Sequence, residues 1–167
     1  RGDQLALIWT DMDTDAEQQF TYKELAANGN KLLNFLRKQG VEQGNNLYML
    51  TPIVPETWFA TFAGIKGGLV SVPTATSMTE REIQFRFEAY KPDVIIAFEG
   101  LTDLVDDALK KADCTPKAKI VLGQKEGWTS YTEIAEENPQ AQAAEVGNED
   151  VLFCFFTSGT TGLPKRV

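Results

Sequence analysis

The sequence predicts an α/β fold of three layers, in which a mainly parallel β-sheet is flanked by helices. Short apolar runs alternate along the chain with amphipathic segments of roughly 10–18 residues, an order typical of βαβ units. The run Val94–Phe98 is apolar at every position, as expected for a strand covered on both faces. Ser/Thr-x-x-Glu capping boxes begin at Thr21, Thr79 and Ser130 and mark the starts of helices.

The first half of the chain is predicted to hold three strands and two helices. Residues 11–19 are polar and predict a loop before the first helix. Gly40 suits the left-handed position that follows a helix, so the first helix is expected to end near Gln39. The second helix carries a stripe of large apolar side chains that is expected to face the core: Trp58, Phe59, Phe62 and Ile65. The predicted strands are Leu5–Trp9, Asn46–Leu50 and Leu69–Val72, and the predicted helices are Thr21–Gln39 and Pro55–Lys66.

The second half continues this alternation and reaches a final apolar run. The helix that begins at Thr79 is expected to place Ile83, Phe87 and Tyr90 on one face. The last run, Val151–Phe156, predicts a buried strand. The other predicted elements are the strands Val94–Phe98 and Lys119–Leu122, helices over about Leu101–Ala112 and Ser130–Glu137, and loops at Gly123–Gly127 and Asn138–Asp150.

The composition predicts one globular domain and argues against several classes of function. The chain has 167 residues, of which 43% are hydrophobic, enough for one core. Its net charge of −8 disfavours nucleic-acid binding and a polybasic membrane anchor, both of which need a basic surface. No apolar run approaches the roughly 20 residues of a membrane span. The chain has no histidine, which removes His-based triads and His metal ligands. Cys114 and Cys154 form no Cys-x-x-Cys pair, no signal peptide is recognised, and a cytoplasmic location is expected.

The segment after the last apolar run has a composition that suits a polyphosphate. Residues 156–165 read Phe-Thr-Ser-Gly-Thr-Thr-Gly-Leu-Pro-Lys. Gly159 and Gly162 allow the backbone to curl so that successive N–H groups point at one anion. The hydroxyl side chains add O–H donors, and Lys165 adds a positive charge. This order of strand, glycine- and hydroxyl-rich loop and lysine predicts phosphate binding.

Three other kinds of loop can be compared with these residues. A solvated Ser/Thr/Gly turn is common after a strand, and Pro164 would only stiffen it. The Walker A motif needs glycine before its lysine and a hydroxyl residue after it, whereas Pro164 and Arg166 occupy these positions. Ser158 does not fit a hydrolase nucleophile elbow, because Phe156 stands where that motif requires glycine.

The ten-residue loop resembles the phosphate-binding signature of the adenylate-forming superfamily, which includes acyl-CoA synthetases, peptide-synthetase adenylation domains and luciferases. Two further stretches, Phe20–Leu25 and residues 63–77, resemble other core motifs of that superfamily. The threonine-rich stretch Thr74–Thr79 resembles the medium-chain and acetyl-type acyl-CoA synthetases. The resemblance implies that nucleotide phosphates are contacted by Thr157, Ser158, Gly159, Thr160, Thr161, Gly162 and Lys165.

By this resemblance, the parent protein is expected to be a carboxylate–CoA ligase. It would join a small carboxylic acid to ATP as an acyl-adenylate and then pass the acyl group to coenzyme A, with Mg²⁺ held by ligands outside this sequence. Residues 1–167 are expected to be an N-terminal fragment of the AMP-binding domain, inactive alone, with a mobile segment at Ser158–Val167. The alternatives are another adenylating enzyme, of the peptide-synthetase type, and a non-catalytic module that retains the motif.

Overall fold

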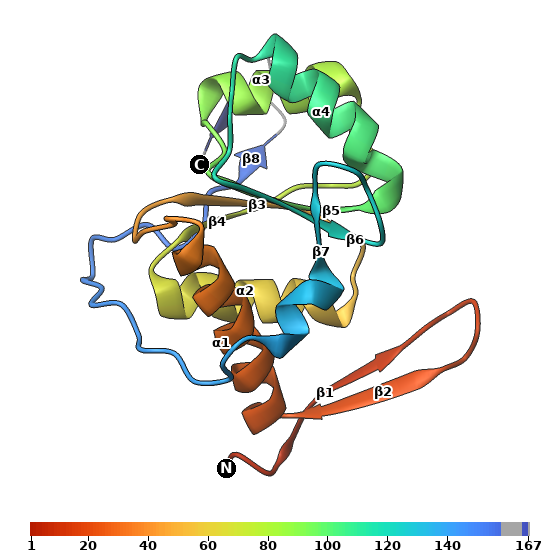
Figure 1. Cartoon of the computed structure of the whole chain (residues 1–167), viewed down its shortest axis with the longest axis vertical. Helices are drawn as coiled ribbons and strands as arrows, with labels where there is room; N and C mark the ends of the chain where they lie inside the picture. Colours follow the sequence, from red (N-terminus) through yellow and green to blue (C-terminus); the bar gives the residue numbers. More distant parts are fainter. Residues whose placement is uncertain (158–164, 167) are drawn as a thin grey trace.

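Five parallel strands form the central sheet, in the order β4-β3-β5-β6-β7 (Figure 1). The computed structural model describes residues 1–157, 165 and 166. Apart from residues 165 and 166, the segment Ser158–Val167, expected to be mobile, therefore lies outside the described residues. Every neighbouring pair of strands in this sheet is parallel, as predicted. The strands are β3 (Asn46–Leu50), β4 (Val70–Pro73), β5 (Val94–Phe98), β6 (Ala118–Leu122) and β7 (Thr129–Ser130).

Helices cover both faces of the sheet, which confirms the predicted three layers (Figure 1). The lower layer in Figure 1 consists of α1 (Tyr22–Lys38), α2 (Pro55–Gly67) and the 3₁₀-helix η2 (Tyr131–Glu136). The upper layer consists of α3 (Glu80–Ala89) and α4 (Thr102–Lys111), the latter preceded by the 3₁₀-helix η1 (Glu99–Leu101).

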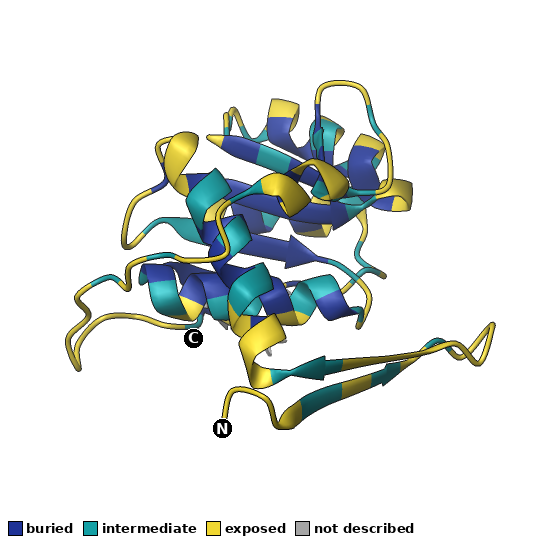
Figure 2. Cartoon of the chain, turned by 60° about the horizontal axis from the view of Figure 1, so that its bottom comes forward, coloured by how far each residue is buried: buried dark blue, intermediate teal, exposed yellow. Residues whose placement is uncertain are grey.

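The alternation of side chains along the strands divides the interior into two cores. Leu47 and Met49 of β3 pack among side chains of α1 and α2, whereas Tyr48 packs with α3 and α4. In β5, Ile96 belongs to the first core and Ile95 to the second. Burying one such side chain stabilises the fold by roughly 1.5–3 kcal/mol, so the two cores hold the layers together. Figure 2 shows the buried residues concentrated in the sheet and on the inner sides of the helices.

The capping boxes begin helices where they were predicted. The Thr21 hydroxyl accepts a hydrogen bond from the Glu24 N–H at 3.2 Å, and the Glu24 carboxylate accepts one from the Thr21 N–H at 2.8 Å. The same reciprocal pair joins Thr79 and Glu82 at the start of α3. Each box satisfies N–H groups that the first helical turn would otherwise leave unpaired.

A two-stranded antiparallel hairpin, β1 (Leu5–Thr10) and β2 (Glu17–Thr21), projects from the body of the molecule (Figures 1 and 2). The predicted loop over residues 11–19 is therefore wrong from Glu17 onward. Gln18 and Gln19 pair with Trp9 and Ile8, and this ladder outweighs their polar composition. The turn between the two strands covers residues 11–16.

The large apolar stripe predicted to face the core from α2 is only partly buried. Trp58 is 43% exposed and Ile65 is 44% exposed, whereas Phe59 is buried. The buried side of α2 instead carries the small residues Ala60, Ala63, Gly64 and Gly67. Close packing requires them: a Cβ on Gly67 would lie 2.6 Å from Leu33 of α1. The helix therefore turns its small residues and Phe59 inward, and Trp58 and Ile65 toward the surface.

The predicted buried strand Val151–Phe156 is wrong over most of its length. Within the described residues, this segment makes one isolated parallel bridge, between Phe153 and Ser71, and only Phe156–Thr157 is a strand, β8. Val151 is 55% exposed and Phe155 is 50% exposed, although Cys154 is buried. The segment lies along the outer edge of β4, and a strand paired on one side alone leaves part of its apolar surface uncovered.

Candidate functional site

The two ends of the candidate phosphate loop lie side by side. Strand β8 pairs antiparallel with β9 (Lys165–Arg166), so that Thr157 stands opposite Lys165 and Phe156 opposite Arg166. The backbone thus enters and leaves the loop at one place, as in a hairpin. The other predicted phosphate-binding residues, Ser158, Gly159, Thr160, Thr161 and Gly162, lie outside the described residues.

Backbone hydrogen bonds to a single residue of β4 tie the chain before the loop to the sheet. The Ser71 N–H donates to the Leu152 carbonyl at 3.0 Å, and the Cys154 N–H donates to the Ser71 carbonyl at 2.9 Å. The Cys154 side chain is 3% exposed within the core beneath α3 and α4, which agrees with the expected buried thiol. Ser71 is therefore the attachment point of this segment.

The space around Ser71 depends on a glycine of α2. A Cβ on Gly64 would lie 2.6 Å from the Ser71 hydroxyl oxygen, which is closer than real Cβ contacts. Within the described residues, that hydroxyl is buried and has no hydrogen-bond partner. Gly64 thus allows α2 to approach β4 closely at the point where the loop segment is attached.

A buried arginine, which the sequence analysis did not single out, packs against the base of the loop. The Arg86 guanidinium lies 5.1 Å from the centre of the Phe156 ring, in a cation–π contact, and its Nη1 donates to the Glu82 carbonyl at 2.9 Å. Burial lowers the pKa of Arg86, while the Glu82 carboxylate acts in the opposite direction. The signal for this residue was its place beside Ile83 and Phe87 on the inner side of α3.

Tyr48 of β3 links Arg86 to the sheet. Its hydroxyl lies 2.7 Å from the Tyr90 carbonyl and 3.2 Å from the Arg86 carbonyl, so it holds the C-terminal end of α3. Burial raises the pKa of Tyr48, which keeps the phenol neutral and able to donate. The base of the loop therefore rests on side chains from α3 and β3 as well as on the edge of β4.

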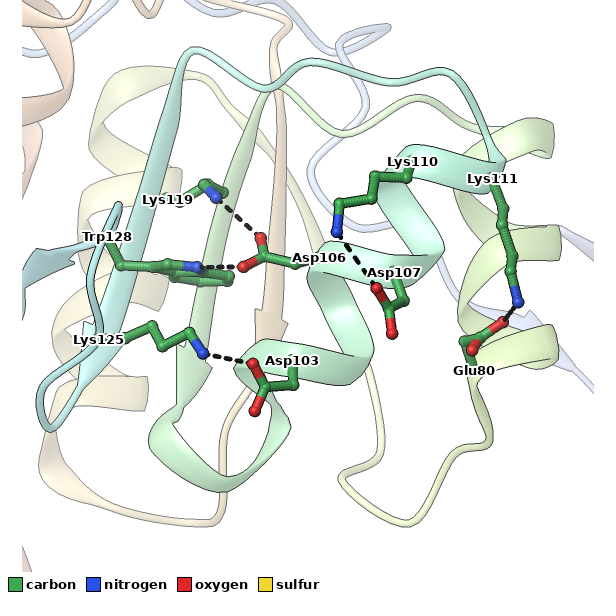
Figure 3. Close-up of polar contacts among 9 residues, drawn as sticks. All are labelled: Glu80, Asp103, Asp106, Asp107, Lys110, Lys111, Lys119, Lys125 and Trp128. Carbon is green, nitrogen blue, oxygen red and sulfur yellow. Dashed lines mark hydrogen bonds and ion pairs between the residues drawn. The ribbon is translucent and has the colours of Figure 1, made fainter.

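A second polar cluster joins α4, β6 and the loop before β7 (Figure 3). The Asp106 carboxylate accepts from Lys119 Nζ at 2.8 Å and from Trp128 Nε1 at 3.1 Å, and Lys119 Nζ also lies 4.9 Å from the centre of the Trp128 ring. Asp103 forms an ion pair with Lys125 close by. Burial alone would raise the pKa of Asp106, but the hydrogen bonds from Lys119 and Trp128 outweigh it and lower that pKa. Because each carboxylate oxygen of Asp106 accepts a hydrogen bond, this cluster holds α4 against β6 and the loop before β7.

The described part of the chain offers neither a cluster of metal ligands nor a membrane-spanning helix. Over residues 1–157, 165 and 166, no three His, Cys, Asp or Glu side chains gather in a way that could hold a metal ion. The helices of the same residues include none with the length and apolar character needed to cross a bilayer.

Known proteins resemble this chain over its whole length. The profile of the AMP-binding enzyme family matches residues 1–167. The 4-hydroxybutyrate–CoA ligase 1 of Metallosphaera sedula is 38% identical over 167 residues, which is 100% of this chain and 29% of the relative. The acetyl-coenzyme A synthetase of Methylocella silvestris is 34% identical and is matched over 99% of this chain and 28% of the relative. The chain thus spans under a third of the length of these relatives.

Solved structures share the fold. The anthranilate CoA ligase AuaEII, in complex with anthranoyl-AMP, superposes with a TM-score of 0.89 at 24% identity, over 100% of this chain and 32% of that one. An acyl-CoA synthetase of Brucella canis gives a TM-score of 0.86 at 19% identity, over 99% of this chain and 30% of that one. The family match over the full length and the similarity of the fold lead to one conclusion: the chain belongs to the AMP-binding enzyme family.

Proposed function

We propose that residues 1–167 are the N-terminal part of an ATP-dependent carboxylate–CoA ligase and end in its phosphate-binding loop. The observation that carries the proposal is the β8–β9 pairing, which brings Thr157 and Lys165 together at the two ends of the motif. The CoA-ligase names of the relatives at 38% and 34% identity support the same assignment. A cytoplasmic location remains part of the proposal.

In this proposal the loop acts on the ATP phosphates during adenylation. A carboxylate oxygen attacks the α-phosphorus, the bond from that phosphorus to the bridging oxygen of pyrophosphate breaks, and acyl-adenylate forms. The thiol of coenzyme A then attacks the acyl carbon, AMP leaves, and the thiol proton passes to solvent. Loop N–H groups, hydroxyls and Lys165 would neutralise charge on the departing pyrophosphate, chiefly by positioning and electrostatics. Mg²⁺, when bound, would neutralise further phosphate charge.

The substrate is proposed to be a small carboxylic acid. The threonine-rich Thr74–Thr79 stretch resembles the medium-chain and acetyl-type enzymes, and the relatives act on 4-hydroxybutyrate and acetate by their names. Residues 1–167 are proposed to be inactive alone, because the chain spans 29% of the first relative's length.

The test is carboxylate-dependent exchange between ATP and pyrophosphate in the full-length parent protein. Acetate, butyrate, 4-hydroxybutyrate, octanoate, benzoate and amino acids are compared in parallel. We expect exchange with one or more of the simple acids and CoA-dependent release of AMP with the same acid. Exchange with amino acids alone would replace the proposal by a peptide-synthetase type of enzyme. Absence of exchange with every acid, in a folded protein, would favour a non-catalytic module.

A further inference from the structure

The order of the strands creates a crevice at the carboxyl edge of the sheet. The chain passes from β3 through α2 to β4 on one side of β3, and then through α3 to β5 on its other side. The connections that leave β3 and β5 therefore run to opposite faces of the sheet. In doubly wound α/β sheets, such a switch point between neighbouring strands is where ligands bind.

A pocket of about 360 Å³ lies at this switch point. Its walls come from the segments that follow β3, β5 and β6 and from the start of η2. Val54, Phe98 and Leu122 supply apolar surface, and Glu56 and Tyr131 supply polar groups. The volume is near the lower end for small-molecule sites, so the pocket suits a compact ligand.

Two polar groups of the pocket lack partners in the described part of the chain. The Tyr131 hydroxyl is buried there without a hydrogen bond, and the Glu56 carboxylate has neither a hydrogen bond nor an ion pair. The two groups interact electrostatically, and burial together with the Glu56 charge raises the pKa of Tyr131, so its phenol stays neutral. A buried, unpaired hydroxyl is unfavourable, but the Tyr131 oxygen is closed off from the pocket surface, so the polar group open to a ligand is the Glu56 carboxylate.

The charge of the pocket selects the chemical class of ligand. Among the described residues that line it, Glu56 is the only charged one, and none is Lys, Arg or His. The N-terminus of α2 lies beside it, but a helix end contributes about half a positive charge, less than the full negative charge of Glu56. An anion is therefore disfavoured. An ammonium group can form an ion pair with the Glu56 carboxylate.

We propose that this pocket binds a small primary amine whose short apolar body lies against Val54, Phe98 and Leu122. The pocket lies across the ends of β3, β5 and β6, whereas the phosphate-loop segment is attached to β4 at the edge of the sheet. Amine binding is thus a property additional to the proposed ligase function and does not depend on it.

Three probes of similar size test the proposal on the 167-residue chain at pH 7. Benzylamine, benzyl alcohol and benzoate are cationic, neutral and anionic, and share one aromatic ring. Binding is measured by calorimetric titration, and the site is located from amide chemical shifts. We expect saturable 1:1 binding of benzylamine, at least tenfold weaker binding of benzyl alcohol, and no binding of benzoate. The largest shifts are expected at residues 54–56, 98, 122–123 and 130–132.

One variant and one control identify the group that binds the amine. Glu56→Gln is expected to weaken the binding of benzylamine at least tenfold. Glu136→Gln removes an exposed acid of η2 outside the pocket and is expected to leave the affinity within twofold. The proposal is overturned by benzoate binding as tightly as benzylamine, by shifts centred elsewhere, by no saturable binding, or by equal losses in Glu56→Gln and Glu136→Gln.

Discussion

Strand β5 and the segment 151–157 are similar apolar runs with different surroundings. Strand β5 is paired along its length with β3 on one side and β6 on the other, and Val94–Ala97 are buried. The segment 151–157 hydrogen-bonds to the sheet backbone at Ser71, and Val151 is 55% exposed. Two neighbours therefore fix a strand in the core, while one neighbour fixes only a point of attachment.

This difference bears on function, because the phosphate motif follows the weakly attached segment. Its base depends on Ser71, on the buried Cys154, and on Phe156 against Arg86. Each hydrogen bond contributes a net stabilisation of about 1 kcal/mol. This is small beside the free energy gained by burying several core side chains. The comparison predicts that substitutions in β5 affect global stability, and that substitutions near Ser71 affect the base of the loop.

Ile96→Ala should have the largest effect. Ile96 is 1% exposed in β5, and removing a buried Ile side chain leaves a cavity that costs about 2–5 kcal/mol of unfolding free energy. Urea denaturation measures this loss. Ile65→Ala is the matched control, since Ile65 is 44% exposed, and it should cost less than about 1 kcal/mol. Equal losses of unfolding free energy in Ile96→Ala and Ile65→Ala would contradict the view that burial in β5 sets global stability.

Gly64→Ala should have the next largest effect and should act on the attachment point. The added methyl would lie 2.6 Å from the Ser71 hydroxyl oxygen, and such overpacking costs about 1–3 kcal/mol. Hydrogen exchange at the Cys154 N–H, which bonds the Ser71 carbonyl, should become faster.

The double variant Gly64→Ala/Ser71→Ala provides the control for this clash. It removes the hydroxyl and leaves the Ser71 Cβ at 4.0 Å, an ordinary contact, so most of the lost stability should return. If the double variant is no more stable than Gly64→Ala, then the steric explanation is wrong.

Thr79→Ala should destabilise the chain by about 1 kcal/mol through the helix that carries Arg86. The substitution removes the hydroxyl that accepts from the Glu82 N–H at the start of α3. Thermal unfolding measures the change, and Thr79→Ser, which keeps the hydroxyl, should lie close to the wild type. A loss in Thr79→Ser as large as that in Thr79→Ala would rule out capping as the cause.

Asp106→Asn should have the smallest effect, at most about 1 kcal/mol, because the Lys119 ion pair is partly exposed to solvent. The pKa of Asp106 is lowered in the folded chain, so its charge stabilises the fold above the ordinary aspartate value of about 4. The contribution should be complete at pH 7 and fade as the pH falls below about 4. Urea midpoints of the wild type and Asp106→Asn should therefore converge toward pH 3. A constant difference from pH 7 to pH 3 would contradict this account.

The sequence predicts best those elements that are specified by residues close together in the chain. Strand β5 and the start of α3 were located correctly, because an unbroken apolar run and a capping box depend on neighbouring residues. The direction in which α2 faces was not predictable from its apolar period. The small residues Gly64 and Gly67 decide it through contacts with Ser71 and Leu33, which are distant in sequence or lie on another element.

The candidate site was also only partly predictable from the sequence. The phosphate motif was visible as a continuous stretch, and the structure adds the pairing of Thr157 with Lys165. Arg86 and Tyr48 were not found as parts of its base, because Arg86 contacts Phe156 across from α3 to β8 and Tyr48 reaches from β3 to the end of α3. The pocket around Glu56 and Tyr131 likewise depends on residues 75 positions apart, brought together by the parallel sheet.

The measurement that tests the central claim most directly is ATP–pyrophosphate exchange in the full-length protein with its best carboxylic acid, comparing Lys165→Ala with Lys110→Ala. Lys110 lies on the outer side of α4 and contacts Asp107 at 3.4 Å, so its removal should leave the rate within twofold. If the loop binds the ATP phosphates, Lys165→Ala should lower the exchange rate by about 10²–10³-fold, as expected for a group that stabilises developing charge. A Lys165→Ala protein that folds normally and exchanges at the wild-type rate would contradict the assignment of the loop.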